Sequence, residues 1–230
     1  MNRDWKAPVV VISAMFIAAA PAWPVDEGEA QAPPMEQIGE KRYRIGEIIV
    51  DQAAAEFTLP GTVLHLSGPL EYLAVARDGL KEYESLLELA ASPTEFNLAC
   101  ILIGLDDKNS VKPRYQFDER KAEGQAVSIS IAWQKDGKTI SISGANAMSV
   151  GDDVFADDSW VYIGSMTSED GQQFMANMTG TLIGFVHDPY SVIDHRNGAA
   201  IGSYGLLTAN EGVLPPEGST VSLTVSLVSQ

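Results

Sequence analysis

The chain is almost devoid of cysteine, since Cys100 is the only one among its 230 residues. One cysteine excludes a disulfide within the chain, and it excludes an iron–sulfur cluster or a structural zinc site held by several cysteines of one chain. A lone cysteine in an apolar stretch most often packs as a small hydrophobic side chain. We therefore expect no iron–sulfur cluster. No other cofactor is predicted, and a divalent metal is the less favoured alternative.

Basic residues are also scarce, with 15 lysines and arginines against 31 acidic residues and a formal net charge of −16. Nucleic acids and anionic lipids are bound through basic patches, so this charge balance disfavours both. The acidic residues are spread along the chain, as on an ordinary solvated surface. The charge suits a soluble protein or a basic partner, and we expect no nucleic-acid partner.

Long hydrophobic runs are missing except near the N-terminus. There, Arg3 and Lys6 precede an apolar stretch at 8–20, and an Ala-x-Ala pattern ends at Ala22. This order of a basic, an apolar and a small-residue segment is typical of a secretory signal peptide. We expect residues 1–22 to be that signal peptide and the protein to be exported to the periplasm or the extracellular space.

The alternative for the same segment is a retained single membrane anchor. Its apolar run of about a dozen residues is short for that role, because a spanning helix needs about 20 apolar residues. No second long apolar run follows, so we expect no stable membrane span after cleavage. Residues 23–41 are rich in proline, glutamate and glycine and predict a flexible linker. Residues 42–230 then form a single domain.

Most of this domain alternates apolar and polar residues in short runs, which predicts about ten short strands. The run 126–133 puts Val127, Ile129, Ile131 and Trp133 on one face. Asp-Gly at 136–137 predicts a hairpin turn into a return strand. Residues 83–89 and 174–178 are also expected to be strands.

One helix signal stands out, at residues 93–104. Ser92 suits the N-cap, Pro93 the first helical position, and Glu95 completes a capping box. Gly104 marks the end. The segment between is apolar nearly all round, which predicts burial on several sides. Together these signals predict an α+β fold, a mostly antiparallel sheet of about ten short strands with one main buried helix.

Several local patterns follow one another along the chain. They are Gly46-x-Ile48-x-Val50-Asp51, Phe57-x-Leu59-Pro60-Gly61, Gly68-Pro69-Leu70-Glu71-Tyr72-Leu73-Ala74-Val75, Lys81-x-Tyr83-Glu84-Ser85-Leu86-Leu87, the helix capped by Pro93, Val127-x-Ile129-x-Ile131-x-Trp133, Trp160-Val161-Tyr162-x-Gly164-Ser165, Val192-Ile193-Asp194 and Leu214-Pro215-Pro216-x-Gly218-Ser219-x-Val221-x-Leu223. In their order and spacing, these patterns resemble the YdjY-domain family of exported bacterial proteins. The resemblance covers most of the chain after residue 42.

The resemblance implies no reaction that carries over to this chain. Some members of the family are described as ferredoxin-like, which the single Cys100 does not support. A histidine often stands at the family positions that correspond to Tyr83 and Asn97 here. A site built on such a pair is therefore absent or altered in this chain.

The sharpest polar cluster joins His187 and Asp188 with Asp194 and His195. Imidazole and carboxylate side chains are ligands for a divalent metal such as zinc. No zinc-protease helix motif surrounds them, and both pairs also suit the polar ends of strands. The metal site is therefore the less favoured interpretation, and it predicts a metal-dependent hydrolase.

Two further catalytic sets are available by residue type alone. A hydrolytic triad requires a nucleophile, a base and an orienting acid, and glycoside hydrolysis requires two carboxylates. No sequence motif marks either set, and exposed polar positions explain them as well. The sets are Ser85 with His65 and Asp51, and Glu71 with Glu84 and Glu88.

These observations favour an exported, non-enzymatic domain that acts by binding or assembly in the bacterial cell envelope. Its ligand or envelope partner is not identified by the sequence. An enzyme is the less favoured class, because no catalytic set is marked by a motif.

Overall fold

The computed structural model describes residues 33–151, 153–154, 157–198, 205 and 207–228, within one compact unit, Pro33–Gln230. The predicted signal peptide and the first part of the predicted linker lie outside the described residues. The elements are β1 (Met35–Gly39), β2 (Arg42–Ile45), β3 (Ile48–Asp51), β4 (Glu56–Val63), β5 (Tyr72–Ala76), η1 (Glu82–Glu84), β6 (Ser85–Leu89), α1 (Pro93–Leu102), β7 (Gln125–Lys135), β8 (Lys138–Ser143), η2 (Ala145–Ala147), β9 (Met148–Val150), β10 (Asp153–Val154), β11 (Trp160–Tyr162), α2 (Ala176–Thr179), β12 (Thr181–Gly184), β13 (Ile193–His195), β14 (Leu207–Ala209) and β15 (Thr220–Leu227).

Eight of the strands close into a barrel, in the order β4, β15, β7, β11, β13, β12, β5 and β6. The ring closes because β6 also pairs with β4, with Gly61 opposite Leu89 and Val63 opposite Leu87. Strands account for 41% of the structure and helices for 11%. The predicted α+β fold with one main helix is therefore wrong, and the domain is a mostly β barrel with added strands.

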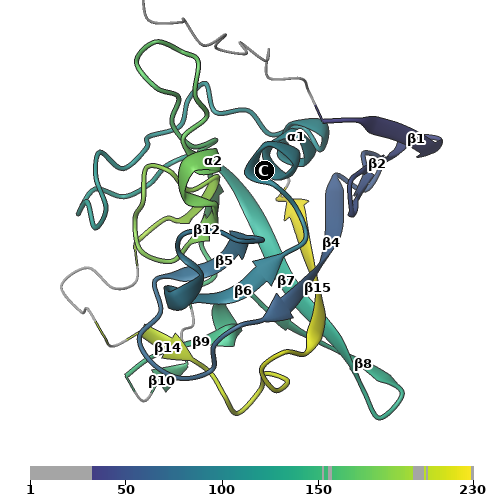
Figure 1. The fold of residues 1–230 in the computed structure, drawn as a ribbon, viewed down its shortest axis with the longest axis vertical. Coiled ribbons are helices and arrows are strands. Elements are labelled where there is room, and N and C mark those ends of the chain that lie inside the picture. Colours follow the sequence, from purple (N-terminus) through teal and green to yellow (C-terminus); the bar gives the residue numbers. More distant parts are fainter. Residues whose placement is uncertain (1–32, 152, 155–156, 199–204, 206, 229–230) are drawn as a thin grey trace, which may run out of the picture. The chain divides into compact units, whose positions relative to one another are not determined.

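The added strands extend the barrel at two places (Figure 1). β1, β2 and β3 continue the sheet outward from β4, and β8 pairs with β7 as the hairpin that Asp136-Gly137 predicts. A separate small sheet holds β10, β9 and β14. β1 lies within the segment for which the composition predicts a flexible linker, so the ordered unit begins before residue 42.

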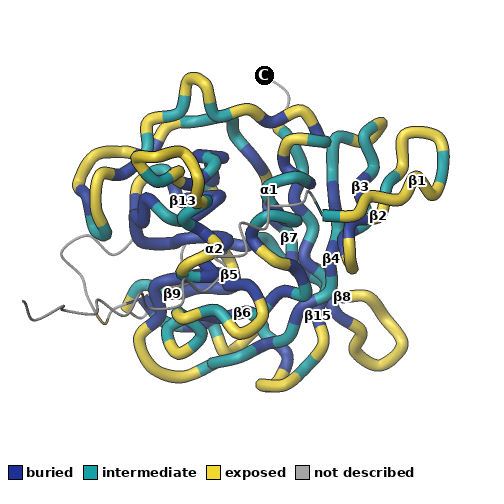
Figure 2. The backbone as a smooth tube through the Cα atoms, turned by 45° about the horizontal axis from the view of Figure 1, so that its top comes forward, coloured by how far each residue is buried: buried dark blue, intermediate teal, exposed yellow. Residues whose placement is uncertain are grey.

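The core fills the barrel with the apolar faces of alternating strands. Leu59, Ile131 and Leu223 are at most 1% exposed, and they belong to three neighbouring strands. β5 and β12 are buried at every position, and the tube is dark along β5 in Figure 2. Strands buried on both faces read as continuous apolar runs, because loops cover the outer face as well.

α1 begins as the sequence predicts. The hydroxyl of Ser92 accepts a hydrogen bond from the Glu95 amide, and the Glu95 carboxylate accepts one from the Ser92 amide at 2.8 Å. The helix buries Phe96, which meets the edge of Phe57 with ring centroids 5.2 Å apart. Ile101 is 51% exposed, however, so the prediction that the helix is buried on several sides is wrong at this residue. The helix packs one face on the barrel and leaves another in water.

Two further sequence predictions are corrected by the structure. Residues 174–178, predicted as a strand, instead lead into the short helix α2, which Gly180 ends in a left-handed conformation with φ of 78°. Tyr83 and Glu84, predicted within a strand, form the 3₁₀ turn η1 before β6. A short helical turn buries too few residues to produce a periodic pattern, so the alternation rule misread both.

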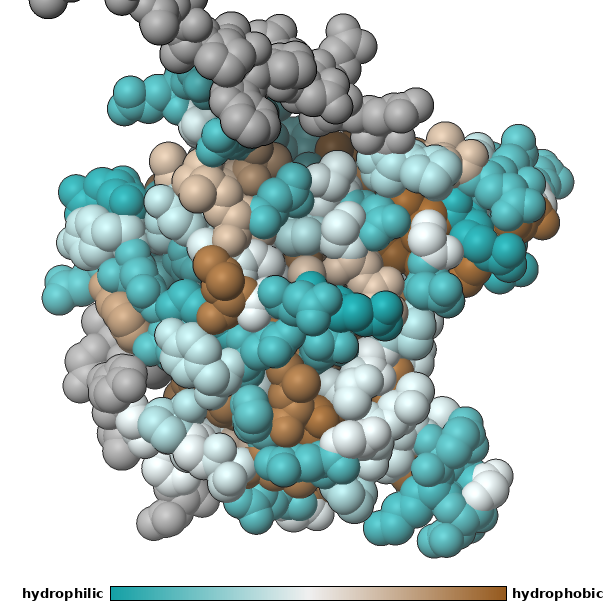
Figure 3. Space-filling view, in the orientation of Figure 1, coloured by the Kyte–Doolittle hydropathy of each residue, from teal (hydrophilic) through white to brown (hydrophobic). Residues whose placement is uncertain are grey.

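Polar and apolar residues intersperse on the face shown in Figure 3, and its hydrophobic residues form small separate groups. This is the ordinary surface of a folded domain. Within the described ranges, no helix combines the length and the apolar character that a membrane span requires.

Candidate functional site

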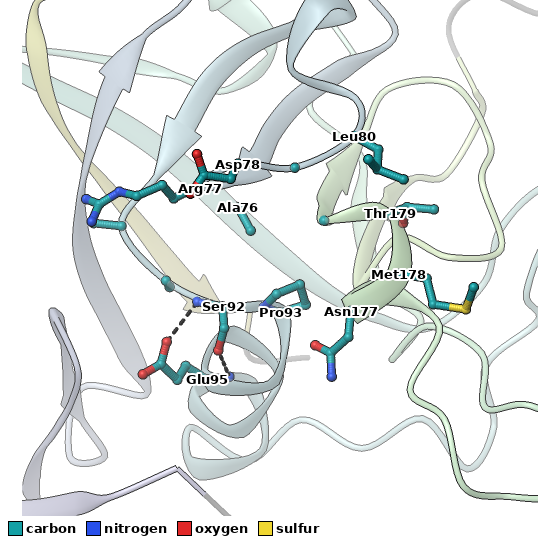
Figure 4. Close-up of a pocket in the computed structure, with 14 residues that line it drawn as sticks. Ala76, Arg77, Asp78, Leu80, Ser92, Pro93, Glu95, Asn177, Met178 and Thr179 are labelled. Atoms are coloured by element: carbon teal, nitrogen blue, oxygen red, sulfur yellow. Dashed lines mark hydrogen bonds between the residues drawn. The ribbon is translucent and has the colours of Figure 1, made fainter. Parts of the chain in front are cut away.

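A cavity of about 410 Å³ opens where three segments far apart in the sequence meet. The turn after β5, the N-terminus of α1 and the end of α2 form its walls (Figure 4). Close backbone contact shapes this junction, since a Cβ on Gly180 would lie 2.5 Å from the Cα of Gly79. The lining residues are Ala76, Arg77, Asp78, Gly79, Leu80, Ala90, Ala91, Ser92, Pro93, Glu95, Asn177, Met178, Thr179 and Gly180.

This cavity has an apolar and a polar side. Leu80 and Met178 are 69% and 54% exposed, and both lie on one side of it in Figure 4. Arg77 and Glu95 lie on the other side, with the Arg77 side chain 66% exposed. Two large apolar side chains left in water beside charged groups are features of a binding surface. We refer to this site as the α1 cavity.

The predicted metal cluster is brought together by the loop that joins β12 to β13, and all four of its residues are buried. The ring of His187 is 0% exposed. Its Nδ1 lies against the carbonyl oxygen of Asp118, and its Nε2 lies 3.0 Å from the carbonyl oxygen of His195. Both ring nitrogens therefore face backbone carbonyl groups, which holds the loop around Asp118 against the barrel.

The two aspartates of this cluster also accept hydrogen bonds. Asp188 accepts one from the Tyr72 hydroxyl at 2.9 Å and one from the amide of Tyr190. Asp194 accepts hydrogen bonds from the amides of Asp188 and His195. Burial raises the pKa of Asp188, and it raises that of Asp194 well above its ordinary value.

His195 is packed between aromatic rings. It stacks on Phe185 with ring centroids 5.6 Å apart, it meets the edge of Trp160, and its Nε2 lies 2.9 Å from the carbonyl oxygen of Asp157. Burial lowers its pKa. Within the described part of the chain, no group of three or more histidine, cysteine or carboxylate side chains is arranged to hold a metal ion. The metal site stays a prediction, to which this geometry adds no support.

The residues available for a hydrolytic triad do not contact one another in the hydrogen bonds that the structure shows for Ser85 and Asp51. The Ser85 hydroxyl is buried and donates to the carbonyl oxygen of Lys81, while Asp51 accepts from the amides of Ala53 and Ala54. Neither interaction is that of a catalytic triad. The third member, His65, is half-buried beyond the end of β4.

Glu71 and Glu84 do come together, through a 2.8 Å hydrogen bond from the Glu71 amide to the Glu84 carbonyl. Burial and the nearby Glu84 raise the pKa of Glu71 to about 7. Glu88 lies farther along β6 and pairs with Arg77 at 3.7 Å.

Sequence reasoning missed a polar network around Glu71. The amide group of Gln116 donates to the Glu71 carboxylate at 2.6 Å and lies 3.3 Å from the Tyr72 hydroxyl. Gln116 is 45 residues from Glu71 in a stretch that looks like a featureless polar loop. Arg114 and Arg120 both bind the buried Asp118 in that loop. Their spacing around Asp118 was the one local signal of an ordered loop.

Asn97 and Tyr83, the positions at which the resemblance implies histidines, make separate contacts. The Asn97 side chain accepts a 2.7 Å hydrogen bond from the Tyr162 hydroxyl. Tyr83 is 68% exposed, with the Lys81 ammonium 5.8 Å from its ring centroid. Asn97 therefore links α1 to β11, and Tyr83 lies at the surface.

The family model for the YdjY domain matches residues 48–226, from the start of β3 into β15, a range that includes strands of the whole ring. No curated protein matches the chain. No solved structure matches it either. The family match covers most of the chain and agrees with the motifs on which the resemblance rests. The chain belongs to the YdjY domain family.

Proposed function

We propose that this chain is an exported, non-enzymatic YdjY domain that binds a partner in the bacterial cell envelope. The observation that carries the proposal is the α1 cavity, a concave site of about 410 Å³ with Leu80 and Met178 exposed at its rim. The histidines of the predicted metal cluster, by contrast, are buried and face backbone carbonyl groups. The α1 cavity is therefore accessible to a partner, whereas the four residues of the predicted metal cluster are buried.

The chemistry of the α1 cavity indicates its partner. Leu80 and Met178 suit an apolar side chain, while Arg77 and Glu95 suit a polar segment that follows it. A short protein segment supplies both within a few residues. Burying each apolar side chain contributes about 1–3 kcal/mol to the free energy of binding. Assembly with another envelope protein is the function that this surface supports best.

The experiment compares what copurifies with the wild type and with a Leu80→Ser/Met178→Ser double variant from the periplasm. We expect one stoichiometric partner with the wild type and its loss with the double variant. Ile101→Ser is the matched control, because Ile101 is 51% exposed on α1 and does not line the cavity. Equal recovery of the partner by all three proteins would contradict the proposal.

Export has a separate test. The signal-peptide pattern predicts a mature protein that begins at Trp23 and is recovered from the periplasm. Intact mass of the purified protein decides this. A full-length chain recovered from the cytoplasm would contradict export and an envelope partner. It would not contradict binding at the α1 cavity.

The metal-dependent hydrolase is the alternative, and it rests on the proximity of His187, Asp188, Asp194 and His195. It predicts one equivalent of zinc in the purified protein and loss of that zinc in a His187→Ala/His195→Ala variant. Metal analysis of the wild type that finds no bound divalent ion rejects it.

A further inference from the structure

A second cavity, of about 350 Å³, opens between the β7–β8 hairpin and the loop that leads into β15. The hairpin projects from the barrel at the strand labelled β8 in Figure 1. It contributes Trp133, Lys135 and Ile140 to the lining, and the loop contributes Val213 and Pro216. None of the residues that line the α1 cavity lines this one, so the two are separate sites. We refer to it as the hairpin cavity.

The walls of the hairpin cavity are mostly apolar. Trp133 is 7% exposed and follows Ile131 by two positions, so it lies on the strand face that fills the barrel. Ile140 stands opposite Trp133 on β8 and is half-buried. On the loop, Val213 is 40% exposed. A concave site of this size, lined by apolar and aromatic side chains, is typical of small-molecule binding.

Charge is ordered along one face of the hairpin. Trp133 pairs with Ile140, and Lys135 pairs with Lys138. Cross-strand partners share a face of the sheet, and so do residues two positions apart on one strand. All four side chains therefore belong to one face, with the apolar pair toward the barrel and the lysine pair toward the turn. A ligand with an apolar body and an anionic end matches this order.

The lining also holds two donors that lack an acceptor. Within the described part of the chain, neither the Lys135 ammonium nor the Trp133 indole N–H has a hydrogen-bond or ion-pair partner. The side-chain amide of Gln134 lines the cavity too, but it donates to the Thr139 hydroxyl at 2.8 Å. A buried indole N–H usually finds an acceptor, and a carboxylate is an acceptor only. The unused donors therefore favour a carboxylate as the anionic end.

Acidic residues adjoin the hairpin cavity in the sequence without lining it. They are Asp136 in the hairpin turn and Glu211 and Glu217 in the loop, and Lys135 is the only ionisable residue among the described residues of the lining. The Glu217 carboxylate accepts a 2.7 Å hydrogen bond from the Leu66 amide. These carboxylates, with a net charge of −16, disfavour an extended anionic surface such as a phospholipid membrane. A small ligand with one anionic group fits the charge pattern better.

We propose that the hairpin cavity binds a medium-chain fatty acid, an alkyl chain that carries one carboxylate. The alkyl chain contacts Trp133, Ile140 and Val213, which removes apolar surface of both partners from water. The carboxylate pairs with the Lys135 ammonium, and the Trp133 indole N–H offers it a second donor. This site does not rest on the proposed partner at the α1 cavity, and its ligand is a small molecule rather than a protein.

The test is a calorimetric titration of the purified chain with decanoate, and with decyltrimethylammonium, which has the same alkyl chain and the opposite charge. We expect decanoate to bind at least about tenfold more tightly than the cation. Lys135→Glu should weaken decanoate binding by about tenfold or more, because it replaces the pairing charge by a repelling one. Val213→Asp should do the same by placing a carboxylate against the alkyl chain.

Each variant has a matched control. Lys121→Glu makes the same charge change at an exposed lysine outside the lining. Val228→Asp makes the same change at a valine that is 44% exposed and also outside the lining. Both controls should bind decanoate like the wild type. All four variants change exposed positions, so thermal melting of the ligand-free proteins should stay close to that of the wild type.

Four outcomes would overturn the proposal. The first is no decanoate bound by the wild type. The second is equal affinity for decanoate and decyltrimethylammonium. The third is decanoate affinity in Lys135→Glu and Val213→Asp that equals that of their controls. The fourth is sedimentation with phosphatidylglycerol vesicles, or self-association, that Val213→Asp abolishes while decanoate does not compete with it, because a membrane or a second copy of the chain would then occupy the cavity.

Discussion

The hydroxyl of Tyr72 donates a 2.9 Å hydrogen bond to the carboxylate of Asp188, which links the start of β5 to the loop that follows β12. Both residues are buried, with Tyr72 0% and Asp188 5% exposed. Burial, with Asp188 close by, also raises the pKa of Tyr72, so the hydroxyl stays a donor at any physiological pH. The contact spans 116 residues of sequence and helps to hold one end of the barrel together.

Tyr72→Phe removes that donor and leaves a buried carboxylate short of one partner. We expect a loss of about 1–3 kcal/mol in the free energy of unfolding, measured by urea denaturation. Tyr83→Phe makes the same chemical change at an exposed ring and should change stability by less than about 0.5 kcal/mol. Equal stability of the two variants would show that the Tyr72 hydroxyl does not support the fold.

Glu71 makes stability depend on pH. Its pKa is about 7 in the folded state against an ordinary value of 4.5, so between these values the folded chain holds more protons than the unfolded chain. Its contribution is therefore fully present below pH 4.5 and is lost as the pH rises through about 7.

The corresponding measurement is the free energy of unfolding between pH 5 and pH 8 for the wild type and for Glu71→Gln. We expect stability to fall as the pH rises, by at most about 3 kcal/mol from this residue, and the slope to flatten in Glu71→Gln. The pKa values of Asp188 and Asp194 are also raised. The stability of Glu71→Gln should therefore still fall as the pH rises, but less steeply than that of the wild type. Parallel pH profiles of the two proteins would refute the role of Glu71.

Gly184 sits where a side chain does not fit. A Cβ there would lie 2.7 Å from the Ser191 hydroxyl, 2.9 Å from the Val186 carbonyl oxygen and 3.0 Å from the Asp194 carboxylate. Gly184→Ala should therefore cost about 1–3 kcal/mol of stability. Gly212→Ala is the control, because its nearest contact is 3.6 Å away. Thermal melting compares the two, and a harmless Gly184→Ala would contradict this packing.

α1 offers a test of which helix face is buried. Phe96 is 0% exposed, so Phe96→Asp should prevent soluble folding, because an unpaired buried charge costs several kcal/mol. Ile101 is 51% exposed, so Ile101→Asp should fold and melt close to the wild type. Circular dichroism of the soluble fractions decides this, and normal melting of Phe96→Asp would reject the buried face.

Features that depend on residues close together in the sequence were predicted correctly. The capping box of Ser92 and Glu95 and the Asp136-Gly137 hairpin are local signals, and both are confirmed. Barrel closure was missed, because it depends on the pairing of β4 with β6, which are separated in the sequence. Alternation of apolar and polar residues predicts a strand but does not predict which strand pairs with it. α2 was read as a strand, although Gly180 marked its end.

The candidate sites were predicted less well than the strands. The histidine cluster stood out because its residues are close in sequence, yet its side chains are buried. The contact of Gln116 with Glu71 joins an unremarkable loop to a strand and has no local signal. The α1 cavity arises from three separated segments, so it requires the fold to be known first.

The proposed envelope partner should contact this YdjY domain at the α1 cavity. The most direct measurement is photo-crosslinking in living cells, with the photoreactive residue placed at Leu80 in one strain and at Asp136, in the β7–β8 turn, in another. We predict one dominant adduct of defined mass from position 80 and none from position 136. Identical adduct patterns from both positions, or no adduct from position 80, would contradict the claim.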